Sequence, residues 1–92
     1  MSDPIVVWDE VDDPDGNTAH VADHGLTQDE VEYVLLDSTN SVGTSRTSGR
    51  PCRFGWTDTG KHIIVIWEEL HDDPEMIYPM TAYEVPPPAY RR

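Results

Sequence analysis

The sequence predicts a small α+β domain in which two short helices pack on an antiparallel sheet, in the order β-α-α-β-β-β. Three observations lead to this prediction. Segment 61–70 is apolar on both alternating faces and rich in Ile, Val and Trp, as a central strand covered on both sides requires. Segment 26–35 instead repeats apolar residues at helical spacing. Segment 52–57 alternates apolar and polar residues, which is typical of a half-buried strand.

The length and charge of the chain limit the classes of protein to consider. Ninety-two residues are enough for one domain, which we assign to residues 1–85, followed by a proline-rich C-terminal tail at 86–92. The single Cys52 excludes an intramolecular disulfide. We expect a cytoplasmic protein without membrane contact, because neither a signal peptide nor an apolar run of membrane length is evident.

The charge is strongly acidic but unevenly distributed. Eighteen Asp and Glu against six Lys and Arg give a net charge of −12, which repels nucleic acids at long range and favours a basic partner. Residues 38–57 contain no acidic residue, however, and this window holds Arg46, Arg50 and Arg53.

The first strand is predicted at residues 5–8, where a short apolar run precedes acidic residues. The acidic loop that follows does not have calcium-loop spacing, because placing Gly16 at the sixth position puts Val11 at the first and Ala22 at the twelfth. A short helix is expected from Asp15 or Asn17 to residue 24.

A second helix is expected to begin at Thr27. Thr27 and Glu30 have the spacing of a capping box, and Leu26 and Val31 that of a hydrophobic staple. Gly25, directly before this segment, suits the left-handed end of the preceding helix.

The first helix carries two histidines four residues apart, His20 and His24, on one face. This spacing allows two imidazoles to bind one metal ion. The residue before the second histidine is Asp23, which is shorter than the Glu of the inverted zinc-protease motif, and a third ligand is not evident. We therefore expect no metal and no cofactor, and an interaction of His24 with the last carbonyls of its helix.

The second half of the chain predicts a meander. A polar loop or edge hairpin at 38–51 leads to a strand at 52–57, and a turn at 58–60 joins it to the central strand. Residues 76–85 form the last strand, at an edge or bulged at Pro79, which lacks an amide hydrogen. We expect one core, formed by Trp8, Val31, Val34, Leu35, Phe54, Trp56, Ile64, Val65 and Ile66.

An ordered series of short motifs resembles a known family. Trp8-Asp9, Asn17 and the His-Gly-Leu-Thr of residues 24–27 come first. Arg53-Phe54-Gly55, a glycine at 60 and a long apolar strand follow. Over residues 5–84 this series is similar to BrnT-like toxins of type II toxin–antitoxin systems, which are relatives of the RelE ribonucleases. The resemblance implies a RelE/BrnT-like fold, metal-independent endoribonuclease activity, and inhibition by a cognate antitoxin that is basic or binds DNA.

The resemblance also implies functional residues. Arg53 matches the basic residue at the start of the family's middle hairpin, and Lys61 the one after the hairpin glycine. RNA cleavage beside a 2′-hydroxyl needs a base, an acid and a stabiliser of phosphate charge. Arg53 suits the last role, whereas Lys61, His62 and Tyr83 suit proton transfer. His62 and Tyr83 have simpler interpretations as a cross-strand neighbour and an amphipathic sheet residue.

The acid-free loop supplies two further candidates, Arg46 and Arg50, which we assign to RNA binding or, more simply, to solubility. The family's last strand ends in a motif like Ser-Ala-Arg, whereas this chain has Tyr83 in place of the arginine. That substitution and the acidic balance favour an alternative function, a non-catalytic interaction module that binds a basic protein partner.

Overall fold

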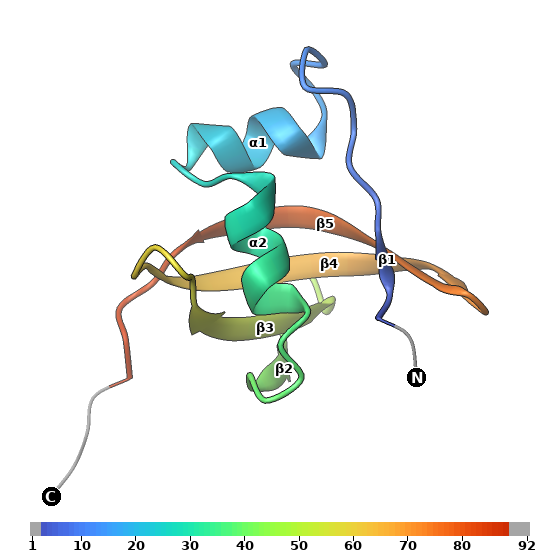
Figure 1. Cartoon of the computed structure of the whole chain (residues 1–92). Helices are drawn as coiled ribbons and strands as arrows, with labels where there is room; N and C mark the ends of the chain where they lie inside the picture. Colours follow the sequence, from blue (N-terminus) through green and yellow to red (C-terminus); the bar gives the residue numbers. More distant parts are fainter. Residues whose placement is uncertain (1–2, 89–92) are drawn as a thin grey trace, which may run out of the picture.

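The computed structural model describes residues 3–88 and places two helices on a five-stranded sheet (Figure 1). The elements are β1 (Ile5–Val6), α1 (Asn17–Asp23), α2 (Gln28–Leu35), β2 (Val42–Thr44), β3 (Pro51–Trp56), β4 (His62–Asp72) and β5 (Glu75–Glu84). The α+β class predicted from the sequence is confirmed. Of the predicted tail, residues 89–92 lie outside the described part of the chain.

The strands lie in the order β1-β5-β4-β3-β2, which puts β4 at the centre as predicted. Two features correct the prediction. First, β1 runs parallel to β5, so the sheet is mixed and not antiparallel throughout. Apolar alternation shows that a segment is a strand but does not show the direction of its partner. Second, the predicted order β-α-α-β-β-β omits β2, a three-residue edge strand that pairs with β3, so residues 38–51 take the edge-hairpin alternative and not the loop.

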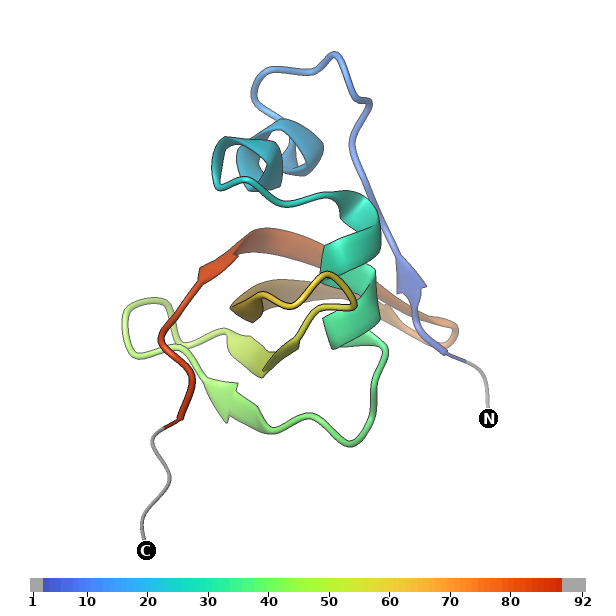
Figure 2. The same ribbon diagram turned by 60° about the vertical axis from the view of Figure 1, so that its left-hand side comes forward.

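The long β4–β5 hairpin carries the bulge predicted at Pro79. Ile66 pairs with Thr81, but the next pair joins Trp67 to Pro79, so Met80 is an extra residue on β5. The missing amide hydrogen of proline explains why regular pairing is interrupted here. β5 bends next to α1, which lies along this strand (Figures 1 and 2).

The predicted single core is wrong, because β4 is apolar on both faces and separates two clusters. The larger cluster lies between the sheet and the helices and consists of Val21, Leu26, Val31, Val34, Leu35, Ile63, Val65, Ile77 and Ala82, with Trp8 packed beside it. Ile64 and Ile66 point to the opposite face and form a smaller cluster with Cys52. Phe54 and Trp56 are also on that face but are exposed.

The end of α1 and the start of α2 follow the sequence signals, but the start of α1 does not, because its N-cap is Gly16, without a side-chain hydrogen bond, and not Asp15 or Asn17. Thr27 and Glu30 form a complete capping box at the start of α2. Gly25 has a φ of 79°, the left-handed conformation that ends α1. Within residues 3–88, neither helix has the length and apolar composition needed to cross a lipid bilayer.

The Glu30 carboxylate joins α2 to the turn between β3 and β4. Glu30 is 4% exposed and accepts hydrogen bonds from the Thr27 amide at 3.0 Å and from the Thr59 hydroxyl. The Lys61 ammonium lies 3.0 Å from Glu30 Oε2, the oxygen that also accepts from Thr59. Burial raises the pKa of Glu30, but the hydrogen bonds from Thr59 and Lys61 outweigh burial and lower the pKa below its ordinary value.

The Asn17 side chain joins β1, α1 and β5. Its amide nitrogen donates to the carbonyls of Val7 and Pro79, each at 3.0 Å, and its oxygen accepts from the Asp9 amide at 2.8 Å. The Asp9 carboxylate accepts from the Asn17 backbone and from the Tyr78 hydroxyl. The Tyr78 hydrogen bond lowers the pKa of Asp9, and the same bond together with burial raises the pKa of Tyr78 to about 12.

We expect Asn17→Ala to destabilise the fold by about 2–4 kcal/mol, because it leaves the buried carbonyl of Pro79 and the part-buried carbonyl of Val7 without their donor. Urea unfolding of the purified protein measures this change. The control is Asp12→Asn in the exposed loop, which should change the free energy of unfolding by less than about 0.5 kcal/mol. Equal effects of the two substitutions would contradict the role of Asn17.

Glu30→Gln should weaken folding at pH 7 by about 1–3 kcal/mol, because Lys61 loses its charged partner. Since the folded pKa of Glu30 is lowered, its contribution is fully present above the unfolded value near 4.5 and disappears as the pH falls through the folded value. The stability difference between wild type and variant should therefore shrink between pH 5 and pH 3. Denaturant unfolding at several pH values checks this, with Glu10→Gln as the exposed control. A difference that stays constant over this range would exclude the proposed linkage.

Candidate functional site

The face of the sheet that points away from the helices carries most of the exposed aromatic side chains, and we call it the open face. Its residues are Cys52, Phe54 and Trp56 of β3, His62, Ile64 and Ile66 of β4, and Tyr83 of β5. The strand register brings Phe54, Ile64 and Tyr83 into one row across three strands. Phe54 and Tyr83 are each 37% exposed and Trp56 is 51% exposed, so this face offers ring surfaces to a ligand.

Of the four predicted catalytic residues, only Tyr83 and His62 lie on the open face. His62 pairs with Trp56, and the centroids of their rings are 5.0 Å apart at an interplanar angle of 55°. Tyr83 is opposite Ile64, which is two residues further along β4 than His62. The structure therefore places a histidine and a tyrosine on the same face, both beside the buried Ile64.

Arg53 lies on the other face, as alternation along β3 requires, and that face is covered by helices. Its Nη1 donates to the carbonyl of Leu35 at 2.6 Å, at the C-terminal end of α2. Its Nε is buried and has no hydrogen-bond partner among the described residues. Since a cation stabilises the negative end of a helix, the contacts of Arg53 are those of a structural residue.

Lys61 is also held on the helix side. Its ammonium binds Glu30 and donates to the carbonyl of Gly25 at 2.9 Å. These contacts anchor the β3–β4 turn to the segment between the helices. The structure thus does not bring Lys61 or Arg53 together with Tyr83 and His62.

The two arginines of the acid-free segment have different positions. Arg46 lines a hollow of about 420 Å³ on the open face, which Phe54, Ile64 and Tyr83 also line. Arg50 instead points toward Glu68, with 3.9 Å between the charged groups, and both side chains are largely exposed. Arg46 is therefore the arginine that shares a site with Tyr83.

A second hollow of about 450 Å³ lies at the Trp56 end of the open face. Trp56 and His62 line it together with the polar residues Asn40 and Ser41. The Asn40 side chain lies directly against Gly55, where a Cβ atom would come within 2.4 Å of the amide nitrogen, so this position requires glycine. Aromatic rings beside amide and hydroxyl groups are suited to an unstacked nucleobase.

His20 and His24 also lie at the border of the open face, which their spacing in the sequence did not indicate. α1 places both along β5: His20 Nε2 is 2.9 Å from the Thr81 hydroxyl, and the His24 ring is 5.7 Å from the Tyr83 ring. Their spacing of four residues showed that they share a helix face, but nothing in the sequence showed that β5 lies beside it. Residues 3–88 contain no cluster of three or more His, Cys, Asp or Glu side chains that would hold a metal ion.

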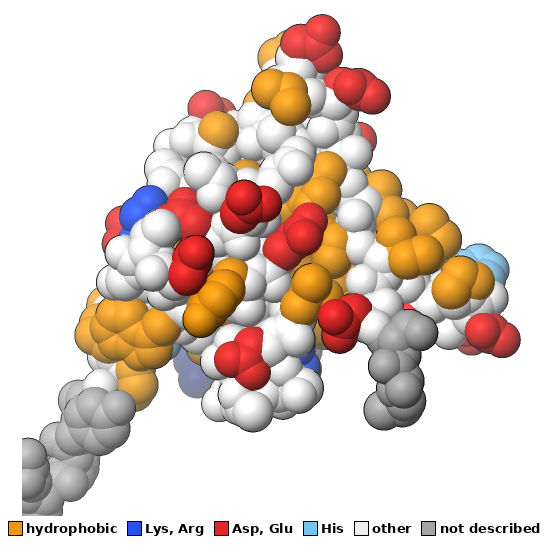
Figure 3. Space-filling model, in the orientation of Figure 1, with side chains coloured by type: hydrophobic (Ala, Val, Ile, Leu, Met, Phe, Trp, Pro, Cys, Tyr) orange, Lys and Arg blue, Asp and Glu red, His pale blue; other side chains and the backbone are white. Residues whose placement is uncertain are grey.

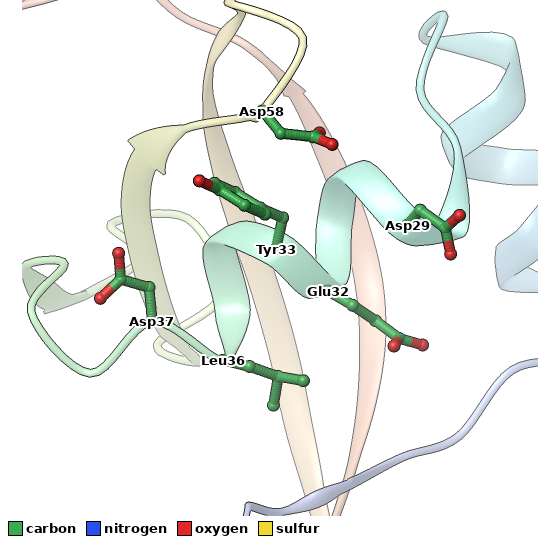
Figure 4. Close-up of a pocket in the computed structure, with 6 residues that line it drawn as sticks. All are labelled: Asp29, Glu32, Tyr33, Leu36, Asp37 and Asp58. Atoms are coloured by element: carbon green, nitrogen blue, oxygen red, sulfur yellow. The ribbon is translucent and has the colours of Figure 1, made fainter.

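The outer side of α2 forms a separate, shallow groove of about 590 Å³ (Figure 4). Tyr33 and Leu36 provide apolar surface, and four carboxylates surround them, from Asp29, Glu32, Asp37 and Asp58. One Glu32 oxygen accepts from the Trp8 indole at 2.6 Å. Hydrogen bonds from the Thr39 side chain and backbone lower the pKa of Asp37. Acidic side chains are spread over this whole side of the molecule (Figure 3).

No match to the chain is found among models of protein families, among curated proteins or among solved structures. The likeness to BrnT-like toxins therefore depends on the short motifs in the sequence. The function of the chain has to be inferred from the open face and the acidic groove.

Proposed function

We propose that the protein is a toxin-like, metal-independent endoribonuclease that binds single-stranded RNA on the open face. The observation that supports this proposal is the row of exposed rings next to Tyr83, with Arg46 in the same hollow. Unstacked bases bind to aromatic side chains with about 1–3 kcal/mol per base. Arg46 supplies a cation for the phosphate in a part of the sequence that has no acidic residue.

The proposed reaction is a transesterification within RNA. The 2′-oxygen attacks the adjacent phosphorus while the bond from phosphorus to the 5′-oxygen breaks, which gives a 2′,3′-cyclic phosphate and a free 5′-hydroxyl. One proton leaves the 2′-hydroxyl and one is added to the 5′-oxygen, so the reaction needs no redox partner. Arg46 stabilises the charge on phosphorus in the transition state, and Trp56 and His62 hold a base beside the scissile bond.

Arg53 and Lys61 have a structural role in this proposal. Their contacts with Leu35, Glu30 and Gly25 hold the helices on the sheet. Substituting either residue would destabilise the protein as well as alter any activity. Arg46 and Tyr83, which lie at the hollow, are therefore the residues to test.

A second candidate function is supported by the groove on α2. Apolar surface from Tyr33 and Leu36 between carboxylates fits a basic amphipathic segment, such as one from a DNA-binding antitoxin. This interaction is compatible with ribonuclease activity, since the groove and the open face lie on different sides of the molecule. If the protein has no ribonuclease activity, binding of a basic segment in this groove would make it a non-catalytic interaction module.

Expression of the protein alone in bacteria should arrest growth and cut cellular RNA. Arg46→Ala should lower the cleavage rate of purified protein about 100- to 1,000-fold, because one stabiliser of phosphate charge is lost. Arg50→Ala is the matched control and should change the rate little, since Arg50 faces Glu68 outside the hollow. Tyr83→Phe tests whether the phenol hydroxyl takes part. Normal growth with intact RNA, at high levels of folded protein, would exclude the ribonuclease.

A helical peptide with Arg on one face and Leu on the other should bind the groove, and its affinity should fall steeply as the salt concentration increases. Calorimetry with Asp29→Asn and Asp58→Asn should show weaker binding, because both carboxylates line the groove. Asp12→Asn, in the loop after β1, is the control of equal charge. If all three variants bind the peptide with the same affinity, binding depends only on the net charge of the protein and the groove is not the binding site.

A further inference from the structure

Three side chains that can transfer protons meet where α1 lies beside β5. The His20 and His24 rings are 5.2 Å apart in an edge-to-face arrangement, and Tyr83 lies 5.7 Å beyond His24. His20 Nε2 is held by the Thr81 hydroxyl at 2.9 Å. The cluster is continuous with the open face, because Tyr83 belongs to both.

These histidines are accessible and are not used to neutralise acids. Both rings are exposed. The ion pairs of the described chain involve Arg50 and Lys61. α1 does not need imidazoles for packing either, since Val21 and Asn17 are its buried residues. The contacts of the two imidazoles with the sheet are the hydrogen bond between His20 and Thr81 and the packing of His24 against Tyr83, and both leave the rings accessible at the border of the aromatic surface.

We propose that His20 and His24 are the acid–base pair of RNA cleavage at the open face. This inference depends on the proposed ribonuclease function and assigns its two proton transfers. One imidazole takes the proton of the attacking 2′-hydroxyl, and the other gives a proton to the departing 5′-oxygen. Histidine is the side chain that most often serves as a general acid or base in catalysis.

The positions of the neighbouring groups support this assignment. In this proposal the scissile phosphate binds in the hollow beside Tyr83, which Arg46 lines from the loop after β2, and His24, at the end of α1, packs against the same Tyr83 ring. The Thr81 hydroxyl fixes the orientation of the His20 ring, which matters because proton transfer needs hydrogen-bond geometry. Thr81 is a positioning residue, whereas the two histidines contact the substrate.

The first test measures cleavage of a short single-stranded RNA by wild type, His20→Gln and His24→Gln. Each variant should be about 100- to 10,000-fold slower, as expected for loss of a general acid or base. His71→Gln is the matched control, because His71 lies at the β4–β5 turn and contacts Pro74. Circular dichroism and binding of the uncleavable 2′-deoxy analogue show whether the variants remain folded and bind.

The second test uses an RNA in which sulfur replaces the 5′-bridging oxygen at the cleavage site. A thiolate leaves without being protonated, because thiols are far more acidic than alcohols. The variant that lacks the general acid should cleave this substrate at nearly the wild-type rate, and the variant that lacks the base should remain slow. This pattern distinguishes catalysis from a structural contribution of either ring.

The outcomes separate the two proposals. If wild type cleaves RNA and both histidine variants cleave equally fast, the acid–base assignment is wrong and the ribonuclease proposal stands. Loss of activity in both variants, with no rescue of either by the sulfur substrate, also overturns the assignment. If wild type cleaves neither substrate, the proposed function is wrong and the role of the histidines is excluded with it.

Discussion

The arrangement of helices on the sheet depends on one buried carboxylate, that of Glu30. A charge removed from water must be compensated by hydrogen bonds and an opposite charge. Here the compensating groups come from the helix start at Thr27 and from Thr59 and Lys61 of the β3–β4 turn. Because Thr59 and Lys61 are distant from Glu30 in sequence, satisfying this carboxylate fixes α2 relative to the central hairpin. The Lys61 ammonium is thereby held against Glu30 and the Gly25 carbonyl, on the helix side of the sheet.

A central strand with two apolar faces has a second consequence for function. The helices cover one face, where Ile63 and Val65 are completely buried, while Ile64 and Ile66 on the other face are covered only by their sheet neighbours. Ile64 of this second cluster pairs with both Phe54 and Tyr83, whose rings are exposed. Because buried neighbours restrict these aromatic side chains, a ligand loses little conformational entropy by ordering them. In this way a 92-residue chain combines a core with an exposed aromatic surface.

Local signals in the sequence were sufficient for the parts of the fold that depend on neighbours in the chain. The capping box at Thr27, the glycine end of α1 and the bulge at Pro79 each follow from a few adjacent residues, and all are confirmed. The parallel partner of β1 was missed, because it depends on contacts between segments about 70 residues apart, and the polar segment before β3 left a loop and an edge hairpin equally open.

The same distinction applies to the site. Alternation predicted that Arg53 points away from Phe54, but not that the helices cover the side to which it points. The histidine spacing in α1 was visible in the sequence, whereas its position beside β5 became visible only in the fold.

The short outer strands affect how the sheet behaves at high concentration. Long, flat outer strands expose unpaired amides and carbonyls, to which a strand from another molecule can add. Here β1 has two residues and β2 has three, and β5 lies beside α1 where it extends past β1. A second copy therefore finds few free backbone groups in register. The protein is thus able to display aromatic rings on its open face without offering its edges as templates for fibre growth.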